Sequence, residues 1–541
     1  MIVFPRDISR VLDDELERDP DRTAVTTRSG ATTYAELDVR ANQCARTLHA
    51  WGVRPGERVA ACLPNDIDIL IAFHGVMRMG AIWVGINQAL SPPEKAYMLR
   101  DSGTRLLLCD DATGAQMDAH RSSLPDLGDV VAIGARDIGG QDDRWRLSLD
   151  AESAAVFESS IDPYAPAAIA YTSGTTGYPK GAVHSQHNLL APGAYLVATR
   201  GYDEQLRKGD CFPLTIINLM VLTTLLTAQA RGSAIIMDSL NARDIAGWIR
   251  RERVTVWNGP PPVLYTMAHD DEIRASDLES LHEVWSGGAD CPEPIRSAFE
   301  SKFGVEIRGT YGQTEAPTVI TIEVPGAAHA PGSSGIPLPH LEVTIRDPAG
   351  RVLQSGEVGE ICVGPRDPAD AQRRLTEDWN VDGATLSGPP EYRPMLEYWN
   401  RPEQSEEVLR AGVLHTGDAG ALDADGNLIV SDRLNLVLNR GGANVYPAEV
   451  ERVVLDFAAV DSCGVFGVPD ARLGQRIAML VQFKPGYESD VEALMDHCRA
   501  ELAAYKVPEF IATVDSLPRN AMGKIDRGVL SELGQEVLAG V

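Results

Sequence analysis

Hydrophobic positions in the first part of the chain follow two alternating spacings. Apolar residues recur at helical spacing over residues 34–51, and short continuous apolar runs follow at residues 58–62, 81–84 and 105–109. Such runs are typical of parallel strands buried on both faces, with helices packed against the sheet. The pattern therefore predicts an α/β fold whose large N-terminal domain consists of layered α/β subdomains.

An uncharged segment at residues 211–230 is long enough to cross a bilayer. Pro213, Asn218 and four threonines interrupt it, and a strand-like run at residues 234–237 follows almost at once. We therefore expect a buried helix of an α/β unit here, and no membrane span.

The pattern becomes strand-rich after residue 334. Runs at residues 341–345 and 359–363 predict a β-rich subdomain. Residues 365–394 are polar, proline-rich and without periodicity, which predicts a long surface loop. Such a loop either covers a binding entrance or a partner surface, or is an insertion without function.

The last part of the chain predicts a separate small domain. A strand at residues 427–431 precedes two helical patterns, at residues 449–455 and 490–504. We expect a mobile α+β C-terminal domain over residues 433–541, after an N-terminal domain over residues 1–432.

Composition narrows the class of partner. The chain has 541 residues, which is too long for one core, and a net charge of −28, which excludes a nucleic acid held by phosphate neutralisation. Eight cysteines without a C-x-x-C pair indicate neither a disulfide framework nor a zinc site, and favour a reduced cytoplasmic setting. The N-terminus lacks a basic stretch followed by an apolar core, so we expect no secretory signal.

The loop at residues 172–181, TSGTTGYPKG, carries the most chemical information. Its hydroxyl and backbone N–H donors suit polyphosphate oxygens, and an apolar run at residues 167–171 predicts a strand leading into it. It is not a Walker A loop, because two residues separate Gly177 from Lys180. We predict a nucleotide-binding loop and not a surface turn.

Five further motifs follow in a fixed order. They are SGGA at 286–289, YGQTE at 311–315, HTGD at 415–418, DR at 432–433 leading to RGGANVYPAEVE at 440–451, and PRNAMGK at 518–524. With the loop, this set resembles the adenylate-forming superfamily, which comprises acyl-CoA synthetases, peptide-synthetase adenylation domains and firefly-type luciferases. The resemblance spans nearly the whole chain.

The resemblance implies an acid:CoA ligase that uses ATP, Mg²⁺ and CoA. A carboxylic acid would react with ATP to give an acyl-AMP and pyrophosphate, and the acyl group would pass to the CoA thiol. Because the carboxylate attacks another anion, catalysis consists mainly of positioning and of neutralising charge.

By resemblance, the N-terminal motifs hold the nucleotide. The phosphates would bind at Thr172, Ser173, Gly174, Thr175, Thr176, Gly177 and Lys180. Thr314 would touch the α-phosphate and Glu315 would bind Mg²⁺, for which one carboxylate plus substrate phosphates is a normal environment. Tyr311 would stack on adenine, where Gly287, Gly288 and Ala289 let the backbone approach, and Asp418 would accept the ribose hydroxyls beside Arg433.

The C-terminal motifs would serve the two steps in turn. Lys524 resembles the lysine that bridges the acyl carboxylate and the α-phosphate, so Lys524, Thr314 and Glu315 form the expected catalytic set. Rotation of the small domain would then bring Arg440, Gly441 and Gly442 to a pantetheine channel. The hinge position holds Asn435 where the family usually has Asp or Lys.

The substrate is expected to be an acid other than an amino acid. Residues 211–237 contain no carboxylate to pair with an amine, and Thr215 and Ile216 replace the aromatic residue and histidine common in acyl-CoA synthetases. An apolar or bulky acid fits the candidate acyl-pocket residues, which are Ile216, Asn218 and Trp285.

Other readings of the same motifs stay open. The enzyme could pass its acyl-AMP to a separate thiolation partner or carrier protein, or act as a luciferase-like oxygenase. A degenerate nucleotide-binding scaffold is disfavoured, because Lys524 and Glu315 are both present. We expect no nucleic-acid or membrane partner, and a homodimer is the default expectation for the oligomeric state.

Overall fold

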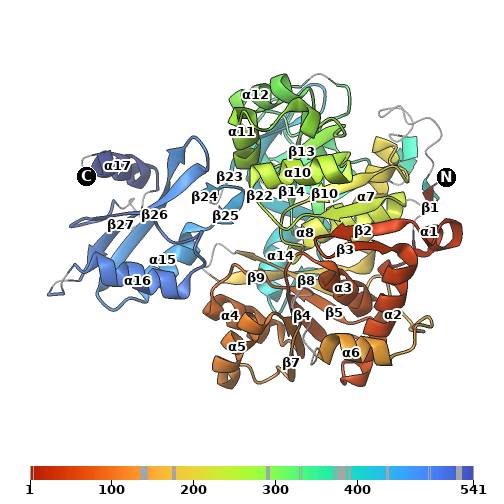
Figure 1. Ribbon diagram of the computed structural model, residues 1–541. Coiled ribbons are helices and arrows are strands. Elements are labelled where there is room, and N and C mark those ends of the chain that lie inside the picture. The colour runs from red at the N-terminus through yellow and green to blue at the C-terminus, as the bar shows by residue number, and fades with distance from the viewer. Residues whose placement is uncertain are drawn as a thin grey trace.

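The computed structural model describes most of the chain. The described residues are 2–3, 5–134, 144–173, 178–287, 291, 293–327, 329–330, 332–367, 369–370, 372–373, 386–387, 391–433, 438–484, 486–487, 489–518, 525 and 527–539. Within them the chain forms a large N-terminal domain of sheets and helices and a small C-terminal domain, as predicted. Figure 1 shows the small domain to the left of the large one.

A seven-stranded sheet forms the lower layer of the large domain in Figure 1. Its strands, in spatial order, are β20 (Glu397–Tyr398), β9 (Pro179–Ser185), β8 (Pro166–Ser173), β5 (Ile82–Gly85), β4 (Arg58–Cys62), β6 (Leu106–Cys109) and β7 (Asp129–Ala132). Its helices are α2 (Tyr34–Ala50), α3 (Ile67–Met79), α4 (Pro92–Ser102), α5 (Asp111–Ala119) and α6 (Arg144–Ala151). The three strands predicted first are confirmed as parallel neighbours to within a residue or two.

Burial on both faces explains the continuous apolar runs. Along β4, Val59 and Ala61 belong to a core with α2 and α3, whereas Ala60 and Cys62 belong to a core with α4 and α5. Successive side chains of a strand point to opposite faces, so both sets must be apolar.

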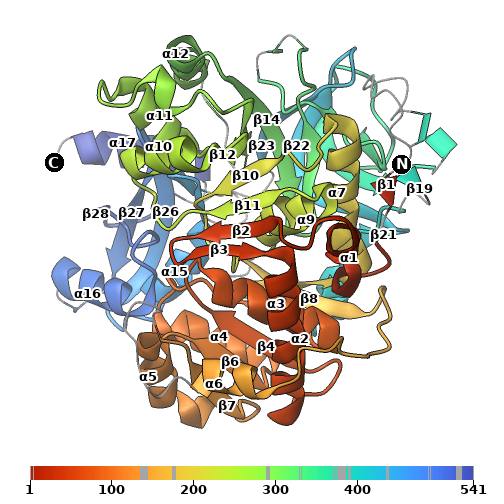
Figure 2. The ribbon, with the colours of Figure 1, turned by 45° about the vertical axis from the view of Figure 1, so that its right-hand side comes forward.

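A nine-stranded sheet lies above the first, as Figure 2 also shows. In spatial order it contains β16 (Ile336–Pro337), β15 (Thr318–Ile322), β14 (Glu306–Gln313), β13 (Glu283–Gly287), β12 (Val256–Asn258), β10 (Arg207–Asp210), β11 (Ser233–Ile236), β2 (Thr23–Thr27) and β3 (Gly30–Thr33). One face packs on α10 (Ala242–Glu252), α11 (Pro261–His269) and α12 (Glu293–Phe303), and the other packs on α7 (Gln186–Arg200) and the β-rich subdomain.

The uncharged segment is a buried helix, but it starts later than Pro213. It runs through α8 (Ile217–Leu219), a π-helical stretch η3 (Met220–Leu225) and α9 (Leu226–Ala230) before β11. Across the described residues, no helix is both long and apolar enough to cross a membrane.

The β-rich subdomain is a five-stranded antiparallel sheet. It contains β17 (Leu341–Arg346), β18 (Gly359–Pro365), β22 (Val413–Leu422), β21 (Leu409–Arg410) and β23 (Leu428–Arg433), with α14 (Pro402–Val408) beside it. Within the predicted loop 365–394, β19 (Leu386–Ser387) pairs with β1 (Ile2–Val3), and Tyr392 is buried. The described parts of that stretch are therefore tied to the body of the domain.

The C-terminal domain is a second α+β unit. Its sheet contains β25 (Ala443–Val445), β24 (Leu438–Arg440), β27 (Gly474–Phe483), β26 (Val460–Asp470) and β28 (Phe510–Thr513). Its helices are α15 (Pro447–Leu455), α16 (Val491–Glu501) and α17 (Arg527–Ala539), and the first two confirm the predicted helices. Short elements among the described residues also include η1 (Ile8–Arg10), α1 (Asp13–Arg18), η2 (Arg121–Ser123) and η4 (Ala275–Asp277).

The small domain packs on the seven-stranded layer. Ala503 belongs to the same hydrophobic core as α4, and Lys506 forms ion pairs with Glu94 of α4 and Glu449 of α15. Arg452 of α15 lies over the ring of Tyr178, 4.4 Å from its centroid, immediately before β9. These contacts bring the small domain next to the predicted phosphate loop.

Candidate functional site

Glu315 lies at a junction of three distant segments. The turn that carries it joins β14 to β15, and the Tyr398 hydroxyl of β20 donates to Glu315 Oε1 at 2.7 Å. Thr172, at the end of β8, donates to the same oxygen at 3.2 Å. Two hydroxyl donors on one oxygen hold the carboxylate in a fixed direction beside the predicted phosphate loop, as a metal-binding carboxylate requires.

Lys180 flanks the same carboxylate. Its Nζ lies 5.2 Å from the centre of the Tyr398 ring, on the strand that follows the phosphate loop. Burial lowers the pKa of Lys180, while Glu407 and Glu315 act in the opposite direction. A cation of the predicted phosphate loop therefore lies close enough to Glu315 to interact with its charge.

The strand β15 begins with a strained residue shortly after Thr314. Thr318, four residues later, adopts a φ of 80°, which is unfavourable for a β-branched residue and costs about 1–3 kcal/mol. Burial lowers the pKa of His184 to about 4, although a hydrogen bond with the Thr314 backbone acts in the opposite direction. Strain held by surrounding structure is typical of residues placed for binding or catalysis.

Asp418 is held from β14. The Tyr311 hydroxyl donates to Asp418 Oδ2 at 2.7 Å, and the Gln313 amide donates to the same oxygen at 2.6 Å. Asp418 is 2% exposed and lies opposite Arg433 on β23. The YGQTE and HTGD motifs thus meet in space, although more than a hundred residues separate them.

Gly287 ends β13 against β14. A Cβ atom on Gly287 would lie 2.0 Å from Thr310 Oγ1, so any other residue here would force Thr310 to shift. Packing against Thr310 therefore accounts for this glycine independently of the predicted approach to adenine.

The 440–442 loop meets the large domain. Gly441 and Gly442 have φ angles of 64° and 87°, which glycine adopts readily. A Cβ atom on Gly442 would lie 3.7 Å from Pro260 Cβ and 3.9 Å from Phe212 Cζ. Arg440 donates from Nε to Glu509 at 2.8 Å, which fixes the strand before the loop.

The candidate acyl residues occupy different environments. Ile216 is 41% exposed, whereas Trp285 is 3% exposed and packs in the core with its ring 4.5 Å from Lys208 Nζ. Asn65, after β4, accepts the Leu214 N–H at 2.9 Å and donates to the Phe212 carbonyl at 2.7 Å. The turn that carries Ile216 is therefore held at the junction of the two large sheets.

Two polar atoms of that turn are buried without a partner. Thr215 Oγ1 and Asn218 Oδ1 have no hydrogen-bond partner among the described residues. Buried polar groups are nearly always hydrogen-bonded, so these two atoms are exceptions that a further hydrogen-bonding group would stabilise.

A buried polar network lies beneath the turn. Lys208 Nζ donates to Asn258 Oδ1 at 2.7 Å, and the Asn258 amide and Thr223 hydroxyl donate to Asp210. Burial lowers the pKa of Lys208 to about 8, against the effect of Asp210 and Glu283. This network fixes the carboxyl ends of β10 and β12, where Phe212 and Pro260 follow.

Sequence reasoning missed three residues of this region. Gln313 could have been found, because it lies two residues after Tyr311 on one strand and so shares its face. No sequence motif marks Tyr398 or Lys208, because the residues that they contact lie far away in the chain.

Several predicted residues are not described. Gly174, Thr175, Thr176, Gly177, Gly288, Ala289, Asn435 and Lys524 lie outside the described residues. Of Ser173 and Arg433, the backbone is described in β8 and β23.

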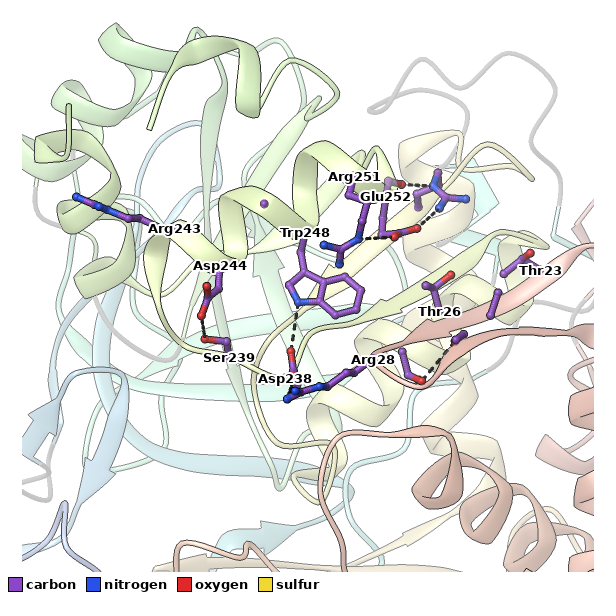
Figure 3. Close-up of a pocket in the computed structure, with 15 residues that line it drawn as sticks. Thr23, Thr26, Arg28, Asp238, Ser239, Arg243, Asp244, Trp248, Arg251 and Glu252 are labelled. Atoms are coloured by element: carbon purple, nitrogen blue, oxygen red, sulfur yellow. Dashed lines mark hydrogen bonds and ion pairs between the residues drawn. The ribbon is translucent and has the colours of Figure 1, made fainter. Parts of the chain in front are cut away.

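A large surface cavity lies elsewhere (Figure 3). It has a volume of about 970 Å³ and lies between the β2–β3 hairpin and α10. Its charged side chains pair with one another, as Arg28 does with Asp238 and Arg251 with Glu252. Among the described residues that line it, none belongs to the predicted site, so we assign it no part in the chemistry.

The chain is similar to known families over most of its length. Residues 12–367 match the AMP-binding enzyme family, and residues 449–524 match the AMP-binding enzyme C-terminal domain. The long-chain-fatty-acid–CoA ligase FadD13 of Mycobacterium tuberculosis is 31% identical over 92% of each chain. A feruloyl-CoA synthase of Amycolatopsis sp is 32% identical over 94% of this chain and 95% of that one.

Solved structures share the fold. A double mutant of the o-succinylbenzoate CoA synthetase of Bacillus subtilis, bound with its product analogue OSB-NCoA, superposes with a TM-score of 0.82. The two chains are 27% identical, and the match covers 97% of this chain and 98% of that one.

Proposed function

The chain belongs to the AMP-binding enzyme family as an AMP-forming acid:CoA ligase, and we propose that its substrate is a bulky, largely apolar acid. We further propose that this acid carries a hydrogen-bonding group away from its carboxylate. The observation that carries both proposals is the turn at residues 213–218. It presents the apolar Ile216 beside two buried polar atoms, those of Thr215 and Asn218.

The relatives support an acid of this kind. Two of them are named for a long-chain fatty acid and for ferulate, which are both bulky, and the latter is aromatic with a hydroxyl group. An amino acid fits less well, because residues 211–237 hold no carboxylate for its amine.

The nucleotide residues are proposed from the geometry. Glu315 would supply the protein carboxylate for Mg²⁺, and the hydroxyls of Tyr398 and Thr172 would hold that carboxylate in place. When bound, Mg²⁺ neutralises phosphate charge. Asp418 would accept the ribose hydroxyls, and Tyr311 and Gln313 keep its carboxylate oriented.

The C-terminal residues would complete the two steps. Lys524 would bridge the acid and the α-phosphate, and the loop from Arg440 to Gly442 would line the CoA channel beside Phe212. A domain boundary close to 432/433 is supported by the sheets, because β23 ends at Arg433 in one sheet and β24 begins at Leu438 in the other.

A panel of acids tests the substrate proposal. We would measure pyrophosphate release and thioester formation with CoA for a fatty acid, an aryl acid with and without a ring hydroxyl, and an amino acid. The hydroxylated aryl acid should exceed its unsubstituted analogue in kcat/KM by about tenfold, because the orphaned atoms cost about 1–3 kcal/mol unpaired. Asn218→Leu should remove this preference.

One result would contradict the substrate proposal, and another would contradict transfer of the acyl group to CoA. Pyrophosphate release with the amino acid alone would overturn the substrate class. Acyl transfer to an acyl-carrier protein but not to CoA would assign the second step to a carrier partner.

Replacement of Lys524 tests the catalytic assignment. We expect Lys524→Ala to lower the rate of acid-dependent pyrophosphate release about 10²–10³-fold, as loss of one charge-stabilising donor does. Circular dichroism should show an intact fold, and Lys484→Ala, at an exposed lysine of the same domain, should keep the wild-type rate. Near-wild-type release from Lys524→Ala would refute the assignment.

A further inference from the structure

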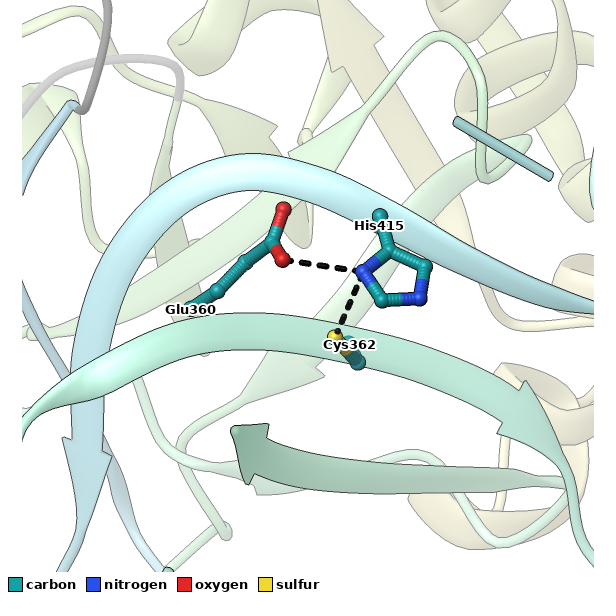
Figure 4. Close-up of side chains that lie close together, drawn as sticks. All are labelled: Glu360, Cys362 and His415. Carbon is teal, nitrogen blue, oxygen red and sulfur yellow. Dashed lines mark hydrogen bonds and ion pairs between the residues drawn. The ribbon is translucent and has the colours of Figure 1, made fainter. Parts of the chain in front are cut away.

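Three side chains with metal-binding atoms converge in the β-rich subdomain (Figure 4). His415 Nδ1 lies 2.9 Å from Glu360 Oε2 and 3.4 Å from Cys362 Sγ, and all three atoms lie within 4.8 Å of one another. Cys362 is buried, whereas the side chains of His415 and Glu360 are 10% and 27% exposed. The thiol of Cys362 therefore lies below the surface, and the two other side chains connect the cluster to solvent.

The strand pairing explains why they meet. Glu360 and Cys362 are two residues apart on β18 and share a face, and Cys362 lies directly opposite His415 on β22. Between the pairs Cys362–His415 and Glu360–Ala419, β22 has three residues where β18 has one. Such a bulge redirects side chains next to it.

Hydrogen bonding uses this cluster poorly. Glu360 as a carboxylate only accepts, so His415 Nδ1 must carry a proton to donate to it. A protonated Nδ1 cannot accept from the Cys362 thiol, so its contact with Cys362 is at best a donation to sulfur, which is a weak acceptor. A cation at the centre would instead use a lone pair of all three groups.

The distances and donors suit zinc. Neighbouring ligands of a tetrahedral zinc ion, with bonds of about 2.0–2.3 Å, are separated by about 3.3–3.6 Å. The sulfur–nitrogen distance of 3.4 Å already has this value, and the nitrogen–oxygen distance of 2.9 Å is shorter than it by only a few tenths of an ångström. Thiolate and imidazole select zinc-like ions over magnesium or calcium.

We propose that Glu360, Cys362 and His415 bind a divalent ion of the zinc class, with water as the fourth ligand. This site is distinct from the proposed magnesium site at Glu315 and does not depend on the substrate proposal. It adjoins the nucleotide residues, because Glu360 Oε1 accepts the Gly417 N–H at 3.3 Å, next to Asp418. An ion that binds only the folded chain should therefore also raise its thermal stability.

Cobalt titration tests the proposal without reference to activity. The full chain, without an affinity tag and freed of metal by a chelator, would be titrated with Co²⁺ and its absorption recorded. We expect a thiolate-to-cobalt charge-transfer band that saturates at one equivalent and disappears when Zn²⁺ is added. Cobalt bound at carboxylates such as Glu315 gives no such band, so the band indicates cobalt that is bound to a cysteine sulfur.

Matched variants identify the sulfur. Cys362→Ser should abolish the band, and Cys291→Ser, at the one cysteine of the described chain whose side chain is not buried, should retain it. His415→Asn should weaken Zn²⁺ binding at least tenfold by calorimetry. A wild-type titration without the band, or a band that persists in Cys362→Ser, would overturn the proposal.

X-ray absorption spectroscopy on the wild-type protein needs no variant, so its result does not depend on whether a variant folds. At the zinc edge of protein loaded with one equivalent, we expect one sulfur neighbour at about 2.3 Å and the rest nitrogen or oxygen at about 2.0–2.2 Å. A first shell without sulfur would also overturn the proposal.

Discussion

Between pH 7 and pH 5, three buried histidines are expected to lower the free energy of unfolding of the large domain by about 6 kcal/mol. Burial lowers the pKa of His74 and His340 to about 3 and that of His184 to about 4. All three side chains are at most 3% exposed. They stay neutral in the folded domain while the unfolded chain takes up protons below its ordinary histidine pKa of about 6.5.

The sign follows from proton uptake. Because the unfolded state binds more protons between about pH 6.5 and pH 4, stability falls as the pH falls through that range. Each histidine costs about 1.4 kcal/mol per pH unit, so three histidines cost about 6 kcal/mol at pH 5. This loss is comparable to the whole stability of an ordinary domain.

Urea unfolding at several pH values measures this loss. All eight tryptophans precede residue 433, so tryptophan fluorescence reports the large domain alone. His74→Leu should reduce the loss between pH 7 and pH 5 by about a third, and the exposed His282→Asn should leave it unchanged. The same loss in His74→Leu as in the wild type would contradict the explanation.

Lys506→Met is expected to release the small domain from the large one. Lys506 Nζ lies 2.6 Å from Glu94 and 2.8 Å from Glu449, and all three side chains are at most 6% exposed. Burial alone would lower the pKa of Lys506, but Glu449, Tyr505 and Glu94 raise it above its ordinary value. Removal of the cation leaves two buried carboxylates without their partner, which costs about 3–5 kcal/mol.

The loss should act mainly on the thioester step. In this domain arrangement Gly442 lies against Pro260 and Phe212, where we propose the CoA channel. We therefore expect the rate of acyl transfer to CoA to fall about 10²-fold or more, while acid-dependent ATP–pyrophosphate exchange is retained. Single-turnover assays of the two steps measure this split.

Two further variants separate docking from folding. Glu94→Gln removes the negative charge that Lys506 pairs with on the large domain but keeps the pair with Glu449 inside the small domain, so it should reproduce the split with less destabilisation. Lys484→Met, at an exposed lysine, should change neither step. Equal losses in both half-reactions of Lys506→Met would show that the ion pairs serve stability alone.

The structure also changes how the cysteines are understood. Their spacing along the chain indicates no zinc site, because Cys362 and His415 are 53 residues apart and belong to no metal motif. Strand pairing makes them direct neighbours. Local spacing rules detect sites built from adjacent residues and cannot detect one assembled across two strands.

The sequence by itself determined the elements and the family. Continuous apolar runs required strands buried on both faces, and β4 is such a strand because helices cover both sides of its sheet. Six ordered motifs identified the nucleotide-binding chemistry, since each carries residue types that phosphate, ribose or magnesium requires.

Tertiary structure alone decided which groups meet. Tyr398 reaches Glu315, Lys506 reaches Glu94, and Asn65 holds the turn before Ile216, all across distances in the chain that no local pattern encodes. The physical reason is that a strand or helix is selected by the spacing of its own side chains, whereas a buried hydroxyl, amide or ion takes whatever partner the packed sheets bring within hydrogen-bond distance.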